Sequence, residues 1–386
     1  MPGTSVYWQI RAVKLHAEMV LRCTDRDWIE QQVRLAGFDL AGVAAVPDEA
    51  DSASAESSRR FAEWVAAGHA GEMQWLKRTD AAGELVRGSL RRSMPWARSV
   101  IVCAINYNAE APRSIDPSSP GAAWIARYAW SGAQDGSRGS DYHDVLLAKL
   151  RAIEFALRER FGSELESRCY VDTGPIVERE YAQRAGIGWI GKNTCVLNQQ
   201  LGSWLLLGVI VTSLELAPEA WAISAADRCG TCTRCIDACP TDALIAPRQM
   251  DATRCISYLT IEKKGSIDES LRAPMGRHVF GCDICQDVCP WNRKAPVSTS
   301  GALPARPELV NPALDWLASM DGPAFNRTFR GSPLERTGRK RILRNVAIAM
   351  GNSGDPSFIP RLSELAVCDD AALAEAARWA LDKLTP

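Results

Sequence analysis

The sequence contains no apolar run long enough to cross a membrane. Its longest, at residues 204–214, is about half the length of a transmembrane helix and predicts a buried strand instead. A secretory signal is also missing, and Arg59 and Arg60 lie too far along the chain to form a twin-arginine leader. We therefore expect a cytoplasmic protein in a reducing compartment, with no membrane partner.

An excess of charge of either sign is missing as well. The 386 residues include 45 Lys or Arg and 46 Asp or Glu, so the formal net charge is −1. A nucleic-acid partner would therefore have to be recognised by a local basic patch, because the total charge attracts no polyanion. Apolar residues make up 46% and charged residues 24%, as in ordinary globular proteins, and the length predicts two or three domains.

Cysteines, by contrast, are concentrated in one region. Of the 13 in the chain, those between positions 229 and 239 follow C-x2-C-x2-C-x3-C-P. This is the ferredoxin spacing, in which the fourth cysteine ligates the other of two [4Fe–4S] clusters. The alternative is structural zinc held by paired C-x2-C units, but the three-cysteine run and two Cys-Pro endings favour iron–sulfur. The isolated cysteines are expected to be small core residues: Cys23, Cys103, Cys169, Cys195 and Cys368.

The spacing predicts two sets of cluster ligands. One cluster would use the first three cysteines and the last, and the other would use the four between them, across a wide gap after Cys255. The sets are Cys229, Cys232, Cys235 and Cys289 for the first cluster, and Cys239, Cys255, Cys282 and Cys285 for the second.

The chain as a whole predicts an α+β multidomain protein. Residues 1–24 are an N-terminal extension, within which Met19 is an alternative start to Met1. Residues 25–225 alternate between helical and strand-like patterns and predict an α/β domain, a sheet covered by helices. Residues 226–295 are the ferredoxin-like module. Residues 296–386 begin with a Pro/Ser/Ala linker and continue as a helical domain that resembles HEAT-type repeats.

Hydrophobic periodicity gives approximate element ranges. Helices are expected at 25–36 with Asp25 as its cap, at 57–67, at 142–161, from Pro175 onward, and at 314–319, 339–350, 357–367 and 371–384. Strands are expected at 38–46, 99–107, 169–172 and 204–214.

A glycine-rich segment superficially matches two phosphate-binding loops. It reads Gly186-Ile-Gly188-Trp-Ile-Gly191-Lys-Asn193. A dinucleotide fingerprint follows a strand and opens a helix, whereas this segment follows a predicted helix and leads into an extended one. Asn193 also stands where the Walker pattern needs a Ser or Thr. We interpret the segment as a loop whose glycines let the backbone approach another flat or anionic ligand.

Several strings in combination resemble one family. They are GEMQWL at 71–76, RYA at 127–129, DYH at 141–143, YVDTGPIVER at 170–179, GIGWIGKN at 186–193, DATRCISYLTIE at 251–262, FGCDICQ at 280–286 and CPWN at 289–292. From about residue 25 to 350, they are similar to the epoxyqueuosine reductases, cobalamin-dependent enzymes that complete queuosine in tRNA. The family's compact R-Y-A-x-G-x-D-Y-H is here split by an insertion between Ala129 and Asp141.

The resemblance implies a reaction. Epoxyqueuosine at the wobble position of tRNA would be reduced to queuosine, with electrons passing through the two [4Fe–4S] clusters to cob(II)alamin (vitamin B12) bound by the α/β domain. Asp172 matches the family's catalytic aspartate and would donate a proton, its pKa raised by burial against the corrin. The competing interpretation is that Asp172 or Thr173 only caps the helix expected to begin at Pro175.

The resemblance also suggests cofactor contacts. The candidate cobalamin contacts are Ser257, Thr260, Asp283, Asn193, Val196, Asn198, Tyr128, His143 and Arg78. No D-x-H-x-x-G string is present, so a histidine is not expected as the lower cobalt ligand. His69 and His278 are expected to be ordinary surface or loop residues.

Substrate RNA is expected to meet two groups of basic residues. Arg179 and Lys263 match family positions that face the substrate. Residues 327–344 hold seven basic residues against one acidic residue, the highest local charge in the chain. Within this run, Arg339, Lys340 and Arg341 are predicted to contact phosphates of queuosine-family tRNAs at the anticodon stem-loop. The alternative is a solvated helix face.

Two other functions are considered. A reductive dehalogenase would share cobalamin and paired clusters, but that class usually carries an export leader and has no need of a basic helical tail. A plain electron-transfer protein would leave residues 25–225 without a role. For the tRNA-modifying reductase we expect a monomer that receives electrons from a one-electron donor such as flavodoxin or ferredoxin.

Overall fold

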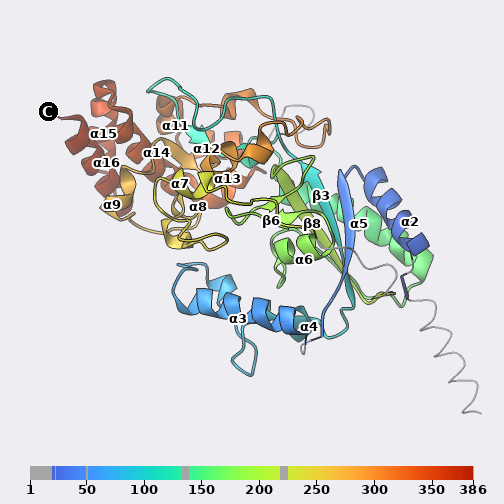
Figure 1. Ribbon diagram of the computed structural model, residues 1–386. Helices are drawn as coiled ribbons and strands as arrows, with labels where there is room; N and C mark the ends of the chain where they lie inside the picture. Colours follow the sequence, from blue (N-terminus) through green and yellow to red (C-terminus); the bar gives the residue numbers. More distant parts are fainter. Residues whose placement is uncertain (1–19, 22, 49–50, 133–138, 218–224, 386) are drawn as a thin grey trace, which may run out of the picture.

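A computed structural model describes residues 20–385, except for residues 22, 49–50, 133–138 and 218–224. In Figure 1 a sheet with its covering helices lies at one end of the molecule, the cysteine-rich module is central and the C-terminal helices lie at the other end. None of the helices in these ranges combines the length and apolar character needed to cross a bilayer.

The central sheet has four strands in the order β2 (Leu40–Ala45), β3 (Ser99–Asn106), β8 (Leu205–Thr212) and β5 (Ser167–Tyr170). Every neighbouring pair is antiparallel. The α/β class predicted for this region is therefore wrong, because α/β folds are built on parallel strands joined by crossover helices. Here the chain between β2 and β3 returns to the same end of the sheet, a direction that hydrophobic periodicity does not encode.

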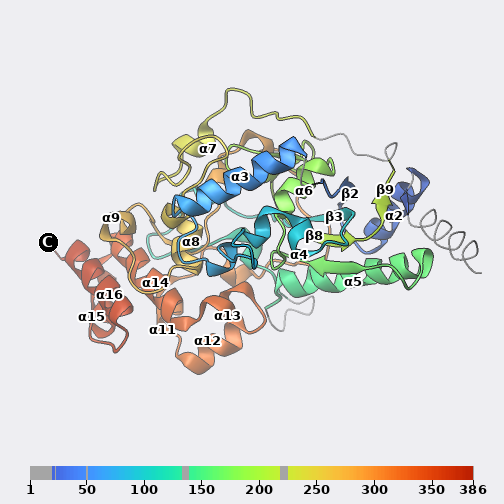
Figure 2. The same ribbon diagram turned by 90° about the horizontal axis from the view of Figure 1, so that it is seen from below.

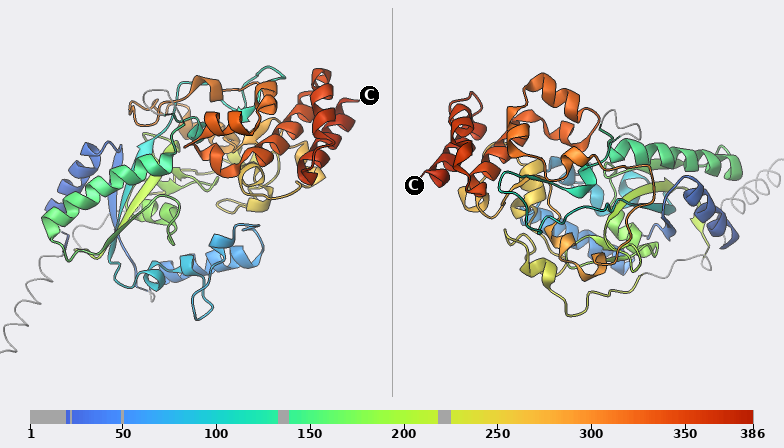
Figure 3. Two further views of the ribbon diagram at one scale, coloured as in Figure 1. Left: turned by 180° about the vertical axis from the view of Figure 1, so that it is seen from behind. Right: turned by 90° about the horizontal axis from the view of Figure 1, so that it is seen from above.

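Helices cover both faces of this sheet (Figures 1 and 3). One face packs against α2 (Cys23–Leu35) and α5 (Tyr142–Phe161), and the other packs against α4 (Leu90–Ser93) and α6 (Glu178–Arg184). The central strand β3 is buried on both sides, with Ile101, Cys103 and Ile105 toward α2 and α5, and Val100, Val102 and Ala104 toward α4 and α6. Such burial explains its continuous apolar run.

The N-terminal boundaries differ from the prediction. Helix α2 begins at Cys23, so Asp25 lies in its first turn and is not its cap. Strand β1 (Val20–Leu21) pairs with β9 (Glu215–Leu216), so the end of the expected extension belongs to the fold. The rest of that extension, with both possible starts, lies outside the described residues.

Helix α3 (Ser52–Ala66) connects the sheet region to the cysteine-rich module (Figure 2). At one end the Ser57 hydroxyl donates to Glu180 of α6 at 2.7 Å. At the other end the Trp64 indole donates to the Met250 carbonyl at 2.6 Å.

The expected cluster module and helical domain share one hydrophobic core, to which residues 122–130 also contribute. Strand β4 (Trp124–Ile125) pairs in parallel with β10 (His278–Phe280), and both lie in a core with α8 (Ile256–Ile261) and α14 (Arg339–Ser353). The domain boundary predicted at residue 295 therefore does not separate two cores.

The stretch predicted as a linker is held against the sheet region. The Pro296 carbonyl accepts a hydrogen bond from the Asn106 side chain at 2.9 Å, and the Arg306 amide donates to the Trp130 carbonyl at 2.8 Å. These hydrogen bonds fix the stretch to the rest of the protein, so it is not a flexible linker.

The C-terminal helices α11 (Leu314–Ser319), α14, α15 (Ile359–Leu365) and α16 (Ala371–Leu384) match the prediction. In this C-terminal region two further helices were not predicted, α12 (Gly322–Phe329) and α13 (Pro333–Thr337). The remaining short elements are β6 (Trp189–Ile190), β7 (Val196–Leu197), α7 (Arg234–Asp237), α9 (Glu269–Arg272) and α10 (Ile284–Asp287). Single 3-10 turns lie at Gln74–Leu76, Val86–Gly88, Arg127–Ala129, Ala252–Arg254, Pro290–Asn292, Pro307–Leu309 and Pro356–Phe358.

Candidate functional site

Asp172 lies on a tight turn directly after β5. The turn is closed by a hydrogen bond from the Thr173 amide to the Val171 carbonyl at 2.7 Å, and Asp172 takes a φ of +57°. A left-handed conformation is unfavourable for most residues and tends to persist at functional positions. Helix α6 begins at Glu178 with Val177 as an N-cap that makes no side-chain cap bond. The capping interpretation of Asp172 and Thr173 is therefore wrong.

Two residues from the first turn of α5 surround the Asp172 carboxyl. The Tyr142 hydroxyl donates to Oδ2 of Asp172 at 2.5 Å, and Nε2 of His143 lies 3.7 Å from the same oxygen. Burial, together with the charge of Asp172, raises the pKa of Tyr142 well above its usual value. Tyr142 therefore remains a hydrogen-bond donor at neutral pH.

The protein alone does not bury the Asp172 carboxyl. Its side chain is 54% exposed, because the turn carries it past the end of β5 and only α5 covers one side of it. Any further burial of this carboxyl would have to come from a bound molecule.

The two ends of the insertion between Ala129 and Asp141 are joined by hydrogen bonds. The Ser131 hydroxyl donates to the Ser140 carbonyl at 2.6 Å, and the Ser140 amide donates back to the Ser131 carbonyl at 3.2 Å. These two bonds bring the two ends of the insertion together. The ring of Tyr142 still packs edge-on against Tyr128, with centroids 5.7 Å apart.

A second carboxyl near Asp172 was not predicted. Glu178 is buried, and its Oε1 has no hydrogen-bond partner among the described residues. Burial, reinforced by the charge of Asp172, raises the pKa of Glu178 to about 7. Arg87 tethers the intervening loop, donating to the carbonyls of Ile176 at 3.1 Å and Asp172 at 3.4 Å. Glu178 lies in the same family-like string as Asp172, and this position could have identified it as a site residue from the sequence.

The four cysteines predicted for the first cluster line one cavity. Cys229, Cys232, Cys235 and Cys289 surround a space of about 240 Å³ together with Trp291 and Leu197. Four thiols around a largely apolar cavity are the donor set that a [4Fe–4S] cluster requires.

The four cysteines predicted for the second cluster are also brought together. Burial raises the pKa of the Cys282 thiol well above its usual value, and negative charge at Cys255 and Cys239 raises it further. The hydrogen bond with Cys195 and burial raise the pKa of the Cys285 thiol well above its usual value, and negative charge at Cys282 and Cys255 raises it further. Cys195, expected to be an isolated core residue, instead contacts the thiol of Cys285.

Several predicted cobalamin contacts are engaged inside the protein. Thr260 is fully buried; its hydroxyl donates to the Ile256 carbonyl at 2.7 Å and accepts from the Gly281 amide at 2.9 Å. The buried Asp283 accepts hydrogen bonds from the indole of Trp124 and the amide of Arg127. Both side chains already make hydrogen bonds within the core, and their contact with cobalamin stays a prediction.

The glycine-rich segment is also explained by packing. Its strands β6 and β7 form a hairpin, and a side-chain carbon at Gly188 would lie 2.1 Å from the Leu197 carbonyl. The glycines therefore allow close chain-to-chain contact, and the predicted approach to a flat or anionic ligand is not needed to explain them. The buried Val196 and the side chains of Asn193 and Asn198 hold this hairpin to its neighbours.

The other candidate contacts are more accessible. Arg78 is exposed, and Tyr128 and Ser257 are half-buried. Ser257 hydrogen-bonds to the Cys255 thiol, next to the second cysteine set. His278 was expected to be a surface or loop residue, but it is buried in β10. Burial lowers the pKa of His278 to about 4. His69 is half-buried and lies 3.5 Å from Asp251.

The basic run at 327–344 is not one exposed face. Arg344 is 2% exposed and donates to the carbonyls of Leu259 and Lys263, joining α14 to the cysteine-rich module. Burial lowers the pKa of Arg344 to about 10. The interpretation of the whole run as a phosphate-binding face is therefore wrong at Arg344, because the cation is used to satisfy buried carbonyls.

Among the predicted RNA contacts, Lys340 is exposed, with 75% of its side chain open to solvent beside Asp370. Arg341 donates to the carbonyls of Thr337 and Ile261, and Arg339 donates to Met320. Two further predicted contacts lie elsewhere: Arg179 is exposed and bonds to the Thr194 carbonyl, and Lys263 pairs with Glu72.

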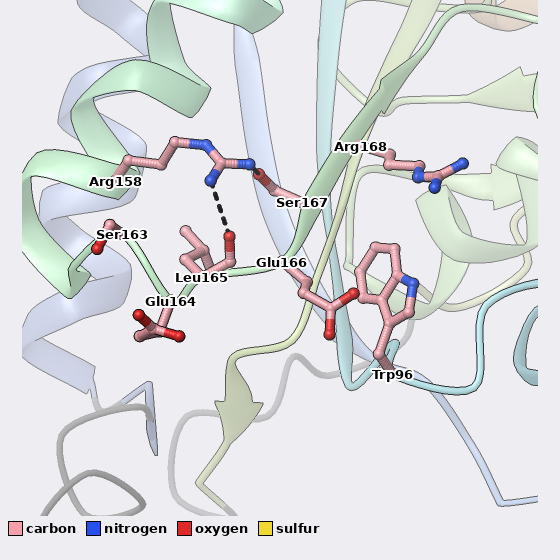
Figure 4. Close-up of a pocket in the computed structure, with 8 residues that line it drawn as sticks. All are labelled: Trp96, Arg158, Ser163, Glu164, Leu165, Glu166, Ser167 and Arg168. Carbon is pink, nitrogen blue, oxygen red and sulfur yellow. Dashed lines mark hydrogen bonds between the residues drawn. The ribbon is translucent and has the colours of Figure 1, made fainter.

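A separate shallow cavity of about 410 Å³ lies at the start of β5, at the opposite end of that strand from Asp172 (Figure 4). Arg158 crosses it and donates to the Leu165 carbonyl at 3.0 Å and the Ser167 hydroxyl at 2.8 Å. Because it lies at the far end of β5 from Asp172, we assign this cavity no part in the site.

Comparisons with known proteins agree on one family. A family model described as "4Fe-4S double cluster binding domain" matches residues 228–292, and one described as "Epoxyqueuosine reductase QueG, DUF1730" matches residues 87–173. An epoxyqueuosine reductase of Xanthomonas campestris is 37% identical over 360 residues, covering 92% of this chain and 94% of the relative. One of Synechocystis is 38% identical, covering 79% of this chain and 98% of the relative.

Solved structures show the same likeness. An epoxyqueuosine reductase with an epoxyqueuosine-modified tRNA-Tyr stem loop superposes with a TM-score of 0.80 at 28% identity, covering 93% of this chain and 90% of the other. The Bacillus subtilis enzyme, with its catalytic aspartate loop swung out of the active site, gives a TM-score of 0.79 at 28% identity, with the same coverage.

Proposed function

Because the chain belongs to the epoxyqueuosine reductase family, whose members are tRNA-modifying reductases, we propose that it reduces epoxyqueuosine to queuosine at the wobble position of tRNA. The observation that carries the proposal is the strained turn that presents Asp172, with Tyr142 bonded to one of its carboxyl oxygens. The proposed substrates are the queuosine-family tRNAs.

The reaction needs both electrons and acid. An epoxide plus two electrons and two protons gives an alkene and water, so both carbon–oxygen bonds break and the oxygen leaves fully protonated. A positioned acid lowers the barrier because an unprotonated oxygen is a poor leaving group.

Asp172 is proposed to protonate that oxygen. The carboxyl that Tyr142 holds through Oδ2 carries the transferable proton in this proposal. Once the proton has left, the Tyr142 hydroxyl stabilises the carboxylate that remains. The left-handed turn holds this carboxyl beyond the end of β5, where a substrate can reach it.

The second proton requires another source. Two titratable groups in the neighbourhood of Asp172 are the proposed sources. His143 lies 3.7 Å from the Asp172 carboxyl, and Glu178 has a pKa of about 7 that the charge of Asp172 helps to raise. We propose that these groups return a proton to Asp172 after the first transfer.

The electrons are proposed to pass through two [4Fe–4S] clusters. A 4Fe-4S double cluster binding domain is present at residues 228–292. The ligands are proposed to be Cys229, Cys232, Cys235 and Cys289 for one cluster, supported by their shared cavity, and Cys239, Cys255, Cys282 and Cys285 for the other. Flavodoxin or ferredoxin is the proposed class of electron donor.

Cobalamin is the proposed electron acceptor next to the substrate; when bound, it would supply a low-potential cobalt centre for the two-electron reduction. Arg78 and Tyr128 keep side-chain polar groups that no described residue engages, and such donors suit the amide fringe of a corrin. Ser257 and His143 are secondary contacts in this proposal because each already hydrogen-bonds to a protein group.

RNA is proposed to bind through the accessible members of the predicted basic residues. Lys340 and Arg179 are exposed, and Arg339, Arg341 and Lys263 flank them while bonding to protein carbonyls or Glu72. A related enzyme has been solved with a tRNA stem loop, which supports this partner. We further propose that the C-terminal helices are HEAT-like and that the protein acts as a cytoplasmic monomer.

The test is anaerobic turnover. Protein reconstituted with clusters and cobalamin is incubated with a strong reductant and tRNA carrying epoxyqueuosine, and the digested nucleosides are read by mass spectrometry. Loss of one oxygen mass, dependent on cobalamin, is the expected result. No conversion by protein that holds both clusters and cobalamin would reject the proposal.

A further inference from the structure

The base of the insertion packs against the C-terminal helical region. A side-chain carbon at Gly139 would lie 2.7 Å from Cβ of Ser332 and 3.1 Å from the Arg330 carbonyl. The turn that precedes α13 therefore lies directly against the residues that lead into α5. This contact brings α13, at residues Pro333–Thr337, next to the start of α5.

One side chain crosses this contact. The Arg336 guanidinium of α13 forms an ion pair with the Asp141 carboxylate, and its Nη1 lies 3.0 Å from Nδ1 of His143. The Asp141 side chain is 10% exposed, whereas that of Arg336 is 50% exposed. The helical region therefore supplies a cation to a largely buried carboxylate beside the proposed acid.

Asp141 in turn holds the ring of His143. It is the N-cap of α5, and its Oδ1 accepts from the His143 amide at 3.0 Å and contacts the His143 ring at Nδ1 at 2.9 Å. An ionised carboxylate can only accept and a guanidinium can only donate, so Nδ1 bonds to one of its two neighbours and not to both. With its hydrogen directed at Asp141, Nδ1 accepts nothing from Arg336, which then acts through its ion pair with Asp141, and Nε2 faces Oδ2 of Asp172 at 3.7 Å.

Asp141 stays ionised in this arrangement. Burial alone would raise its pKa, but hydrogen bonds from His143 and the charge of Arg336 outweigh burial and leave the pKa lowered. The charged groups that face His143 are thus Asp141, Asp172 and Arg336, and the ring also packs on Tyr142 with centroids 4.2 Å apart.

We propose that Arg336 is a positioning residue of the reductase: it holds Asp141, and through Asp141 it aims Nε2 of His143 at Asp172. The inference rests on the proposed function and adds a dependence on the helical region. A proton taken from solvent by Nε2 then passes to the Asp172 carboxylate, replacing the one given to the substrate. If α13 moves away from α5, Nε2 of His143 is no longer held facing Asp172, whereas Asp172 and Tyr142 keep their own hydrogen bond.

The alternative role for a half-exposed arginine on this face is a direct contact with an RNA phosphate. The two roles differ in what they change. A positioning residue alters the rate with bound RNA, whereas a phosphate contact alters affinity and its dependence on salt.

The experiment is a double-mutant cycle of Arg336→Gln and Asp141→Asn in the reconstituted enzyme. Asn keeps the helix cap of α5 but removes the charge that Arg336 holds. Single-turnover conversion at saturating tRNA is measured beside the Kd for an anticodon stem-loop. Each single variant is expected to convert about 10 to 100 times more slowly, as when a reacting group is misplaced by about 1 Å. The double variant is expected to be no slower than the slower single variant, with Kd unchanged.

Two further variants complete the test. Arg336→Lys keeps a cation and is expected to restore part of the rate, whereas Arg34→Gln removes an exposed arginine of α2, outside the proposed site and the basic run, and is expected to convert at the wild-type rate. Additive losses in the cycle, a weaker Kd with unchanged rate, or a wild-type rate for Arg336→Gln would each overturn the positioning role. If the wild-type protein itself fails to convert epoxyqueuosine, the proposed function fails first.

Discussion

The Tyr142 hydroxyl donates a 2.5 Å hydrogen bond to Oδ2 of Asp172, joining the first turn of α5 to the turn after β5. Removal of this hydroxyl should leave the fold intact, because the ring still packs against Tyr128. Hydrogen bonds to charged groups contribute about 1.5–3 kcal/mol, so Tyr142→Phe is expected to slow single-turnover conversion by roughly 10- to 100-fold. Tyr181→Phe is the matched control, since Tyr181 is a buried tyrosine of α6 whose hydroxyl bonds to no described residue. Equal rates for the two variants would contradict the role of Tyr142.

Asp172→Asn tests the acid itself. Asn tolerates the left-handed conformation found at this position, so the turn should persist while the transferable proton is lost. The variant is expected to keep its iron and cobalamin content and to lose turnover by about 100-fold or more, the usual contribution of a general acid. Cofactor content is measured by absorbance and metal analysis beside nucleoside mass spectrometry. Activity close to that of the wild type would exclude Asp172 as the donor.

Glu178 should make stability depend on pH. Because its folded pKa of about 7 lies above the usual carboxyl value, its contribution to stability is present at low pH and is lost as pH rises through 7. The groups that influence it are Asp172, Arg87 and Arg179. When the pH is raised from 6 to 8, the free energy of unfolding of Glu178→Gln is therefore expected to rise by about 1–2 kcal/mol relative to that of the wild type. This corresponds to a few degrees in Tm.

The control for that measurement is Glu180→Gln. Glu180 accepts from Arg184 at 2.8 Å and from Ser57 at 2.7 Å, so its replacement should lower Tm across the pH range without a relative gain at pH 8. A constant difference between wild type and Glu178→Gln from pH 6 to 8 would contradict the raised pKa.

Cys289→Ala tests the pairing of the cluster ligands. Cys289 follows Cys285 closely in sequence, yet it lines the cavity of Cys229, Cys232 and Cys235. Its replacement is expected to remove the cluster at that cavity and about half of the iron, while the signal of the other cluster remains in electron paramagnetic resonance. Cys368→Ala, in the C-terminal helical region, should change neither. Selective loss of the other cluster would refute the assignment.

Lys340→Gln separates RNA binding from folding. Lys340 is exposed, whereas Arg341 and Arg344 also satisfy carbonyls of the cysteine-rich module. The variant is expected to bind the stem-loop more weakly. The slope of log Kd against log salt should fall by about one, the contribution of a single phosphate contact. Lys383→Gln, an exposed lysine at the end of α16, is the control and should bind like wild type. Identical salt slopes for wild type and Lys340→Gln would remove Lys340 from the RNA interface.

Features carried by local spacing could be predicted from the sequence. The cysteine run identified an iron–sulfur module and predicted which four thiols share a cavity, because cluster ligands must recur at short fixed intervals. Helix α5 was predicted with its observed bounds, since an apolar stripe at helical spacing extends along its whole length. The strings around Asp172 likewise indicated the family by themselves.

Only the tertiary structure decided which distant groups meet. Tyr142 and Asp172 are 30 positions apart, and Asp141 and Arg336 are 195 apart, so no local pattern pairs them. Strand direction and the burial of Arg344 escaped prediction for a related reason. Periodicity reports which face of an element is apolar, whereas direction and burial depend on how separate elements pack against each other.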